Sequence, residues 1–142
     1  EIFWRRAPAA VAGAPDEKLA FAAWPLDWSH AEEDVHTLRQ KAEAVGLPSV
    51  SLVLAADVSY DPGLVGLMLS TLSKLCASSW VAPDAELILV HQRRAEDVDS
   101  ALMTGLAELG VKVKPLDCAV AEAEGLGRVQ LFRAALSGGR AR

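Results

Sequence analysis

Three groups of polar and aromatic residues follow predicted strands, and their types could do chemistry. They are Trp28, residues 57–60 (DVSY) and residues 91–94 (HQRR). In open α/β sheets ligands bind beyond the carboxyl ends of the strands, so we expect the three groups to border one cleft. There, the His91 imidazole could act as a base, and the two arginines could contact an acidic substrate. We favour the plainer interpretation of a hydrogen-bonded surface histidine and a solvated pair of arginines.

Two apolar strands, each followed by a helix, would position these residues. Residues 50–56 (VSLVLAA) form an almost continuously apolar strand, as expected where helices cover both faces of a sheet. Residues 86–91 (ELILVH) form a second buried strand. Asp61 is the N-cap of the helix between the strands, because Pro62 follows it at the first helical position. Residues 95–109 form the helix after the second strand.

The segments before this unit contain one predicted strand and one predicted helix. Residues 19–24 (LAFAAW) are predicted to form a buried strand. A helix then begins at Ser29, because Ser29 and Glu32 make a capping box. It ends at Gly46, which supplies a left-handed C-terminal cap. Residues 78–83 are predicted to form a loop.

The end of the chain changes the pattern of strands and helices. Residues 111–116 and 129–134 are predicted strands, and the loop between them has no strong helical pattern, which favours an antiparallel pair. The whole order predicts an α/β, Rossmann-like fold with a mostly parallel sheet and a C-terminal antiparallel strand pair. The expected organisation is a poorly ordered lead-in, one α/β domain and a disordered tail, at residues 1–17, 18–136 and 137–142.

The composition predicts one acidic domain. The chain has 142 residues, is 51% hydrophobic and has a net charge of −5. This length allows a hydrophobic core, and the acidic balance argues against nucleic-acid binding, which needs a basic face. No apolar run approaches the roughly 20 residues of a membrane span. Two cysteines make no disulfide framework, and His30 and His36 lack metal-ligand spacing. We therefore expect a cytoplasmic protein with no metal, nucleic-acid or membrane partner.

Two short motifs connect this order of elements to a known family. Residues 26–28 (LDW) are an L-x-W run, and residues 57–60 (DVSY) are a D-x-x-Y run after the following strand. With these motifs in this order and an antiparallel strand pair at the end, residues 19–136 resemble the seven-stranded S-adenosylmethionine-dependent methyltransferases. Within that class they are most similar to the branch that methylates protein lysines, methyltransferase family 16.

The resemblance implies roles for four residues. Trp28 would lie against the adenine of S-adenosylmethionine with its indole face, and Ala56 would line the cofactor pocket with its backbone. Asp57 and Tyr60 would be the catalytic residues and face the methyl-transfer end. There, the carboxylate would accept a hydrogen bond from the amine of a protein substrate, and the ring would favour a cationic nitrogen. Methyl transfer depends mainly on positioning and on a deprotonated amine.

One part of the family pattern is missing. The family's first strand ends in a Gly-rich loop that holds the methionine part of the cofactor, and an acidic residue after the second strand holds the ribose. Neither is found here, since Gly13 follows no predicted strand. The alignment therefore implies the C-terminal part of the domain, truncated on its N-terminal side. A sheet cut there would expose an apolar edge that is prone to association.

Other interpretations stay open at the level of the residues and of the function. Asp57 could cap the turn before the next helix, Tyr60 could be an ordinary core residue, and Trp28 could pack under the sheet. The alternative function is a non-catalytic α/β interaction module, or an inactive fragment, derived from the methyltransferase fold. A receiver-like or flavodoxin-like domain fits less well, because no acidic cluster or phosphate loop follows the first strand.

Overall fold

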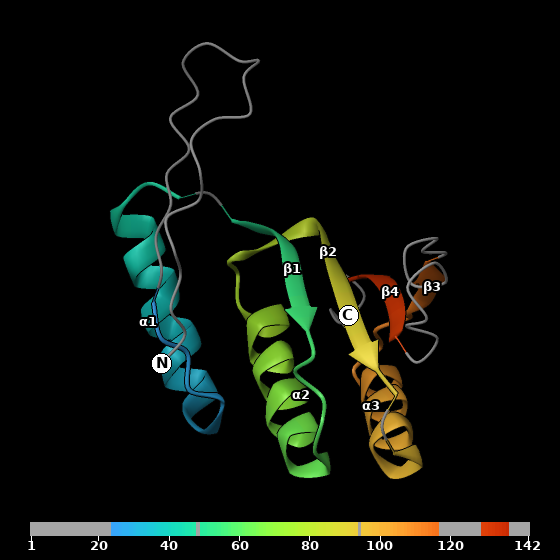
Figure 1. The fold of residues 1–142 in the computed structure, drawn as a ribbon. Helices are drawn as coiled ribbons and strands as arrows, with labels where there is room; N and C mark the ends of the chain where they lie inside the picture. Colours follow the sequence, from blue (N-terminus) through green and yellow to red (C-terminus); the bar gives the residue numbers. More distant parts are fainter. Residues whose placement is uncertain (1–23, 48, 94, 117–128, 137–142) are drawn as a thin grey trace, which may run out of the picture.

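The computed structural model describes residues 24–47, 49–93, 95–116 and 129–136. Helices and strands alternate as far as α3, and two strands follow (Figure 1). In chain order the elements are the 3₁₀ helix η1 (Trp28–His30), α1 (Ala31–Ala44), β1 (Val50–Ala56), α2 (Pro62–Ala77), β2 (Val81–Gln92), α3 (Glu96–Glu108), β3 (Lys114–Leu116) and β4 (Val129–Ala135). The predicted lead-in, the predicted tail and residues 19–23 of the first predicted strand lie outside the described residues.

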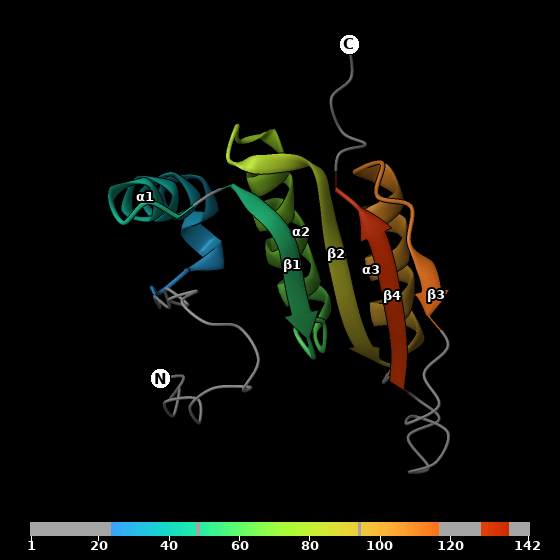
Figure 2. The ribbon, with the colours of Figure 1, turned by 90° about the horizontal axis from the view of Figure 1, so that it is seen from above.

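The described sheet is mixed and has four strands in the order β1-β2-β4-β3. β1 and β2 pair in parallel, whereas β4 pairs antiparallel with β2 and with β3. The predicted antiparallel pair near the end of the chain is therefore confirmed. The sheet is less parallel than predicted, because β4 lies between β2 and β3 and separates two strands of the same direction (Figure 2). The length of the preceding loop indicated an antiparallel neighbour but not this position.

Helices α2 and α3 cover one face of the sheet and form the main core with it. Figure 2 shows both helices behind the strands, and α1 beside α2, beyond β1. Alternate residues of β2 point into this core, as the two-residue period of a strand requires. The largest fully buried side chains are those of Leu89, Leu102, Leu106, His91 and Val65.

The other face of β1 is uncovered. Leu54 is 71% exposed, and Leu52 and Ala56 on the same face are exposed as well. Val53 and Ala55 point the opposite way and are half-buried against the core. The prediction that helices cover both faces of this strand is wrong for the described part of the chain, where one face alone is covered.

Several element ends follow from single residues, as predicted. The Asp61 carboxylate accepts hydrogen bonds from the backbone N–H groups of Gly63 and Leu64 and so caps α2, with Pro62 at its first position. Gly46 and Gly110 have φ values of +71° and +73°. These positive values suit glycine after a helix end, because other residues are strained there.

The predicted start of α1 is wrong. Ser29 lies in η1, and its N–H and hydroxyl both donate to the Asp27 carboxylate, at 2.9 and 2.6 Å. The Glu32 carboxylate instead accepts from the Lys74 ammonium of α2 at 2.8 Å, so no capping box forms. Asp27 competes successfully for Ser29 because it lies two residues earlier, within reach of an Asx-type turn.

Two strand boundaries also differ from the predictions. β2 begins at Val81, inside the predicted loop at 78–83, and its pairing with β1 shifts register between Val50 and Leu52. This irregularity allows Val81, at the start of β2, to pair with Val50. β3 is limited to Lys114–Leu116, half of the predicted strand at 111–116, and pairs with β4 at three positions.

Candidate functional site

The candidate site lies where β1 and β2 end. The two strands are parallel, so their carboxyl ends lie at the same end of the sheet (Figure 1). The segment at 57–60 leaves β1, and the segment at 91–93 closes β2 and leads to α3. The predicted convergence of these two groups is thereby explained: they follow neighbouring parallel strands.

Asp57 turns the chain at the end of β1 with an unusual backbone. Its φ is +52°, in the left-handed region that non-glycine residues rarely adopt. Its N–H donates to the carbonyl of Val90 at 3.0 Å, which extends the β1–β2 ladder by one bond. Aspartate is one of the few residue types that tolerate this conformation. Such backbone geometry is concentrated at functional sites.

Ser59 and Tyr60 point to different environments. Ser59 is 2% exposed, whereas Tyr60 is 53% exposed. Tyr60 is therefore not an ordinary core residue, which removes one of the alternatives that the sequence left open. Its ring is accessible to a ligand, as an aromatic wall of an acceptor site would be.

His91 is the central polar residue of the site and is only 1% exposed. Its Nδ1 lies 2.7 Å from the Ser59 hydroxyl, and its Nε2 lies 2.7 Å from the Asp99 carboxylate of α3. The Arg93 Nε donates to the other oxygen of Asp99 at 2.8 Å. The favoured interpretation of His91 as a surface residue is wrong. The arrangement ties the ends of β1 and β2 to α3.

The sequence contained a signal for the burial of His91. Leu87, Leu89 and His91 alternate along β2, and all three point to the helix-covered face. The strand period could therefore have placed His91 in the core. Ser59 and Asp99 could not be found in this way, because they lie in a loop and on a helix distant in sequence from each other.

Asp99 is held ionised by its neighbours. The hydrogen bond from Arg93 is the largest influence and lowers the pKa of Asp99 below the usual value for aspartate. Partial burial acts in the opposite direction, whereas the hydrogen bond with His91, and the charge of its ring when that ring is protonated, lower the pKa further. An ionised carboxylate only accepts hydrogen bonds. His91 must therefore carry a proton on Nε2.

Trp28 belongs to a second feature, an apolar groove that residues of β1 and α2 also line. Trp28 is half-buried, packs against the main core, and lines this groove of about 170 Å³. Val58, the second residue of the DVSY run, lines the same groove. The structure thus brings Trp28 and the segment after β1 together. Ala56 is exposed and does not line this groove.

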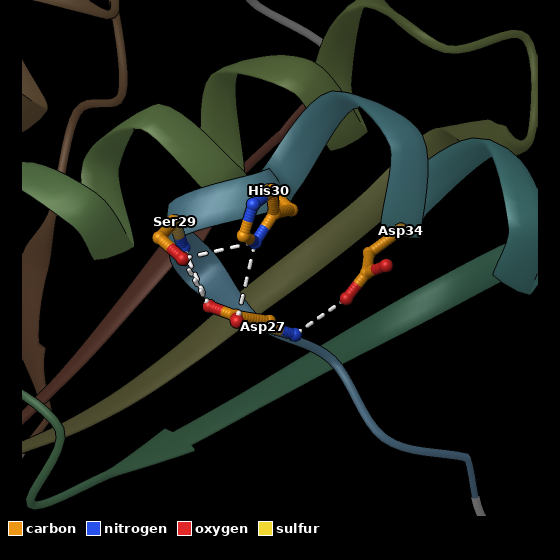
Figure 3. Close-up of polar contacts among 4 residues, drawn as sticks. All are labelled: Asp27, Ser29, His30 and Asp34. Atoms are coloured by element: carbon orange, nitrogen blue, oxygen red, sulfur yellow. Dashed lines mark hydrogen bonds and ion pairs between the residues drawn. The ribbon is translucent and has the colours of Figure 1, made fainter.

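A polar cluster fixes the backbone around Trp28. Figure 3 shows Asp27 between Ser29, His30 and Asp34. The Asp27 N–H donates to the Asp34 carboxylate at 2.6 Å, and the Nδ1 of His30 lies 3.2 Å from the Asp27 carboxylate. The hydrogen bonds from Ser29 lower the pKa of Asp27. These contacts hold η1 at the start of α1 and orient the segment that carries Trp28.

The described lining of this groove is apolar apart from Thr71. It contains no carboxylate. Among the described residues no group of three metal-binding side chains occurs. No described helix combines the length and apolar character needed to cross a bilayer.

Comparisons with protein-family models and with curated protein sequences find no match to this chain.

Proposed function

We propose that this chain contributes the acceptor side of an S-adenosylmethionine-dependent methyltransferase that acts on protein lysine side chains. The observation that carries the proposal is the grouping at the end of β1. The segment at 57–60 begins with the strained Asp57 and ends with the exposed Tyr60. Its Val58 lines the groove that Trp28 also lines. The antiparallel final strand of the α/β sheet agrees with the resemblance to this enzyme class.

In this proposal Asp57 and Tyr60 bind the incoming amine. The Asp57 carboxylate accepts a hydrogen bond from the amine, and the Tyr60 ring favours a cationic nitrogen at its face. Trp28 stacks on the adenine of the cofactor, and the backbone at Ala56 borders the cofactor. S-adenosylmethionine supplies the methyl group, and these residues supply position. The free thiol of Cys76 suits the proposed cytoplasmic setting.

The uncovered side of the sheet supports the idea that the cofactor site is only partly formed by these 142 residues. β1 is the edge strand of the described sheet, and one of its faces is exposed. Parallel strands normally have both faces covered. The groups that would hold the methionine and ribose parts of the cofactor belong, by the resemblance, to strands that would lie beyond this edge.

Calorimetric titration of S-adenosylhomocysteine into the chain, with its folding checked by circular dichroism, tests the proposal. We expect binding that Trp28→Leu weakens roughly two- to tenfold, the value of one aromatic stacking contact. Trp28→Phe is the matched control and should retain most of the affinity. A folded chain that binds no S-adenosylhomocysteine would favour the second candidate, a non-catalytic module or an inactive fragment.

A specific observation favours the second candidate, a non-catalytic interaction module or inactive fragment. The exposed large hydrophobic residues of the described chain all precede residue 68, in the half that surrounds β1. They are Leu26, Val45, Leu52, Leu54, Tyr60 and Leu67. Exposed apolar patches of this kind mark interaction surfaces. A folded chain that binds no cofactor but associates through these residues would have this function.

A further inference from the structure

The buried Ser59–His91–Asp99 arrangement has no role in the function proposed above. Its imidazole lies at the end of β2 and connects that strand to the segment after β1 and to the first turn of α3. Both serine and histidine are almost fully buried. A buried polar group without a partner destabilises the folded state. Because Ser59, His91 and Asp99 are all paired, the network favours the one arrangement of residues 57–60 that keeps these hydrogen bonds.

The direction of the hydrogen bonds follows from the ionised Asp99. A neutral imidazole that donates from Nε2 to this carboxylate must accept at Nδ1. The Ser59 hydroxyl then donates to Nδ1, at 2.7 Å. This order resembles the serine, histidine and acid of a hydrolase, but Ser59 is 2% exposed and cannot meet a substrate. The network is suited to holding the loop and not to nucleophilic attack.

The anchored serine lies between the two proposed catalytic residues. On one side, Asp57 is fixed by its left-handed backbone and by its N–H bond to Val90. On the other side, Asp61 is fixed as the N-cap of α2. Ser59 is the middle attachment, because its side chain is almost fully buried and bonded to His91, whereas the neighbouring Val58 is only partly buried. The exposed Tyr60 therefore lies between two fixed residues, Ser59 and Asp61.

We propose that Ser59 and His91 are positioning residues that set the backbone at Asp57 and the direction of the Tyr60 ring. As a statement about amine binding, this inference rests on the proposed methyltransferase function. As a statement about the loop, it can be tested without any cofactor. Asp99 acts one step further away, because it selects the imidazole tautomer that accepts from Ser59.

Nuclear magnetic resonance of the full chain tests the inference. Tyr60 is the only tyrosine, so ¹³C-labelled tyrosine gives signals from this ring alone. We expect Ser59→Ala to shift or broaden those signals while the fold is retained. The ¹⁵N signals of His91 should show a proton on Nε2 and a bonded, unprotonated Nδ1. His36→Gln, at an exposed histidine of α1, is the control and should leave the Tyr60 signals in place.

A pair of His91 variants separates positioning from simple loss of stability. Asn places an amide near the position of Nδ1 and can keep the bond to Ser59, whereas Gln places an amide near Nε2 and can keep the bond to Asp99. We expect His91→Asn to retain the wild-type Tyr60 signals and His91→Gln to lose them. Equal spectra for the two folded variants, or a proton on Nδ1 in the wild type, would overturn the inference.

The functional arm uses the same variants with S-adenosylmethionine and a lysine peptide. His91→Gln should lower kcat and leave the KM for the cofactor unchanged, and His91→Asn should restore much of the loss. Absence of cofactor binding in the wild type would reject the proposed function. The Tyr60 signals would then still decide whether Ser59 and His91 position the loop.

Discussion

At the scale of single residues, the most unusual feature is the positive φ of Asp57, a non-glycine residue. For most L-residues the left-handed region costs about 1–2 kcal/mol relative to the ordinary helical conformation, a penalty that glycine avoids and that Asp and Asn tolerate better than other residues. The strain is placed directly between the most apolar strand and the segment that carries Tyr60. Glycine would adopt this backbone conformation with less strain. The presence of a carboxylate at position 57 is therefore consistent with a functional side chain.

Two substitutions of Asp57 isolate the backbone from the side chain. Asp57→Gly and Asp57→Ala both remove the carboxylate, but only alanine must adopt a positive φ with a Cβ. We expect the alanine variant to be less stable than the glycine variant by about 1 kcal/mol, measured by urea denaturation. Equal free energies of unfolding would show that this backbone is not strained. Ala is consequently a poor choice for testing catalysis here, and Asn, which tolerates positive φ, is better.

At the scale of elements, the packing of α2 on α3 depends on a glycine. Gly105 of α3 faces the side chain of Leu69 of α2, and a Cβ at position 105 would overlap Leu69. Gly66 of α2 is also inside a helix, but a Cβ there would meet open space. Both glycines lower the helix propensity, yet only Gly105 brings two elements close together.

Replacement of these two glycines by alanine should therefore change the free energy of unfolding differently. Gly66→Ala should raise the free energy of unfolding by up to about 1 kcal/mol, because alanine favours helices. Gly105→Ala should give less stability than Gly66→Ala, since Leu69 must move to make room. Thermal or urea unfolding measures both. Adding Leu69→Ala to each variant is the check: the two glycine sites should show different coupling to it, and equal coupling would contradict the close contact.

At the scale of the whole molecule, the sheet is covered by helices on one face only in the described part. Leu54 is 71% exposed at the edge strand, on a face with no described helix over it. An apolar edge strand offers both hydrogen-bonding groups and hydrophobic surface to another chain. The molecule thus has a side that favours association.

We expect Leu54→Lys to reduce concentration-dependent self-association in sedimentation velocity experiments. A charged side chain on an edge strand opposes strand pairing, and Leu54 contributes little to the core because it is mostly exposed. Thr104→Lys, at an exposed position of α3, is the matched control for added charge. A wild-type chain that is monomeric at all concentrations, or an unchanged Leu54→Lys variant, would contradict this expectation.

Local signals account for most of what could be predicted. Asp61 with Pro62 defines the start of α2, and positive φ at Gly46 and Gly110 follows two helix ends. The burial of His91 was also present in the strand period. The position of β4, the short β3 and the partners of His91 depend on residues far apart in the chain, and no local pattern encodes which strand or side chain they meet. The sequence predicted that Trp28 and the segment at 57–60 border one cleft, and both contribute to one groove. The ligand of that groove stays a prediction.

The position of β4 has a consequence for how the protein folds as it is made. β4 is the last of the described strands but an inner strand of the described sheet, and its Ala135 pairs with Glu86 of β2. Until residues 129–135 have left the ribosome, the side of β2 that β4 covers stays unpaired and β3 lacks its partner strand. Long-range pairing of this kind is slow to form. During that period the nascent chain exposes an unpaired strand edge, which chaperones would protect.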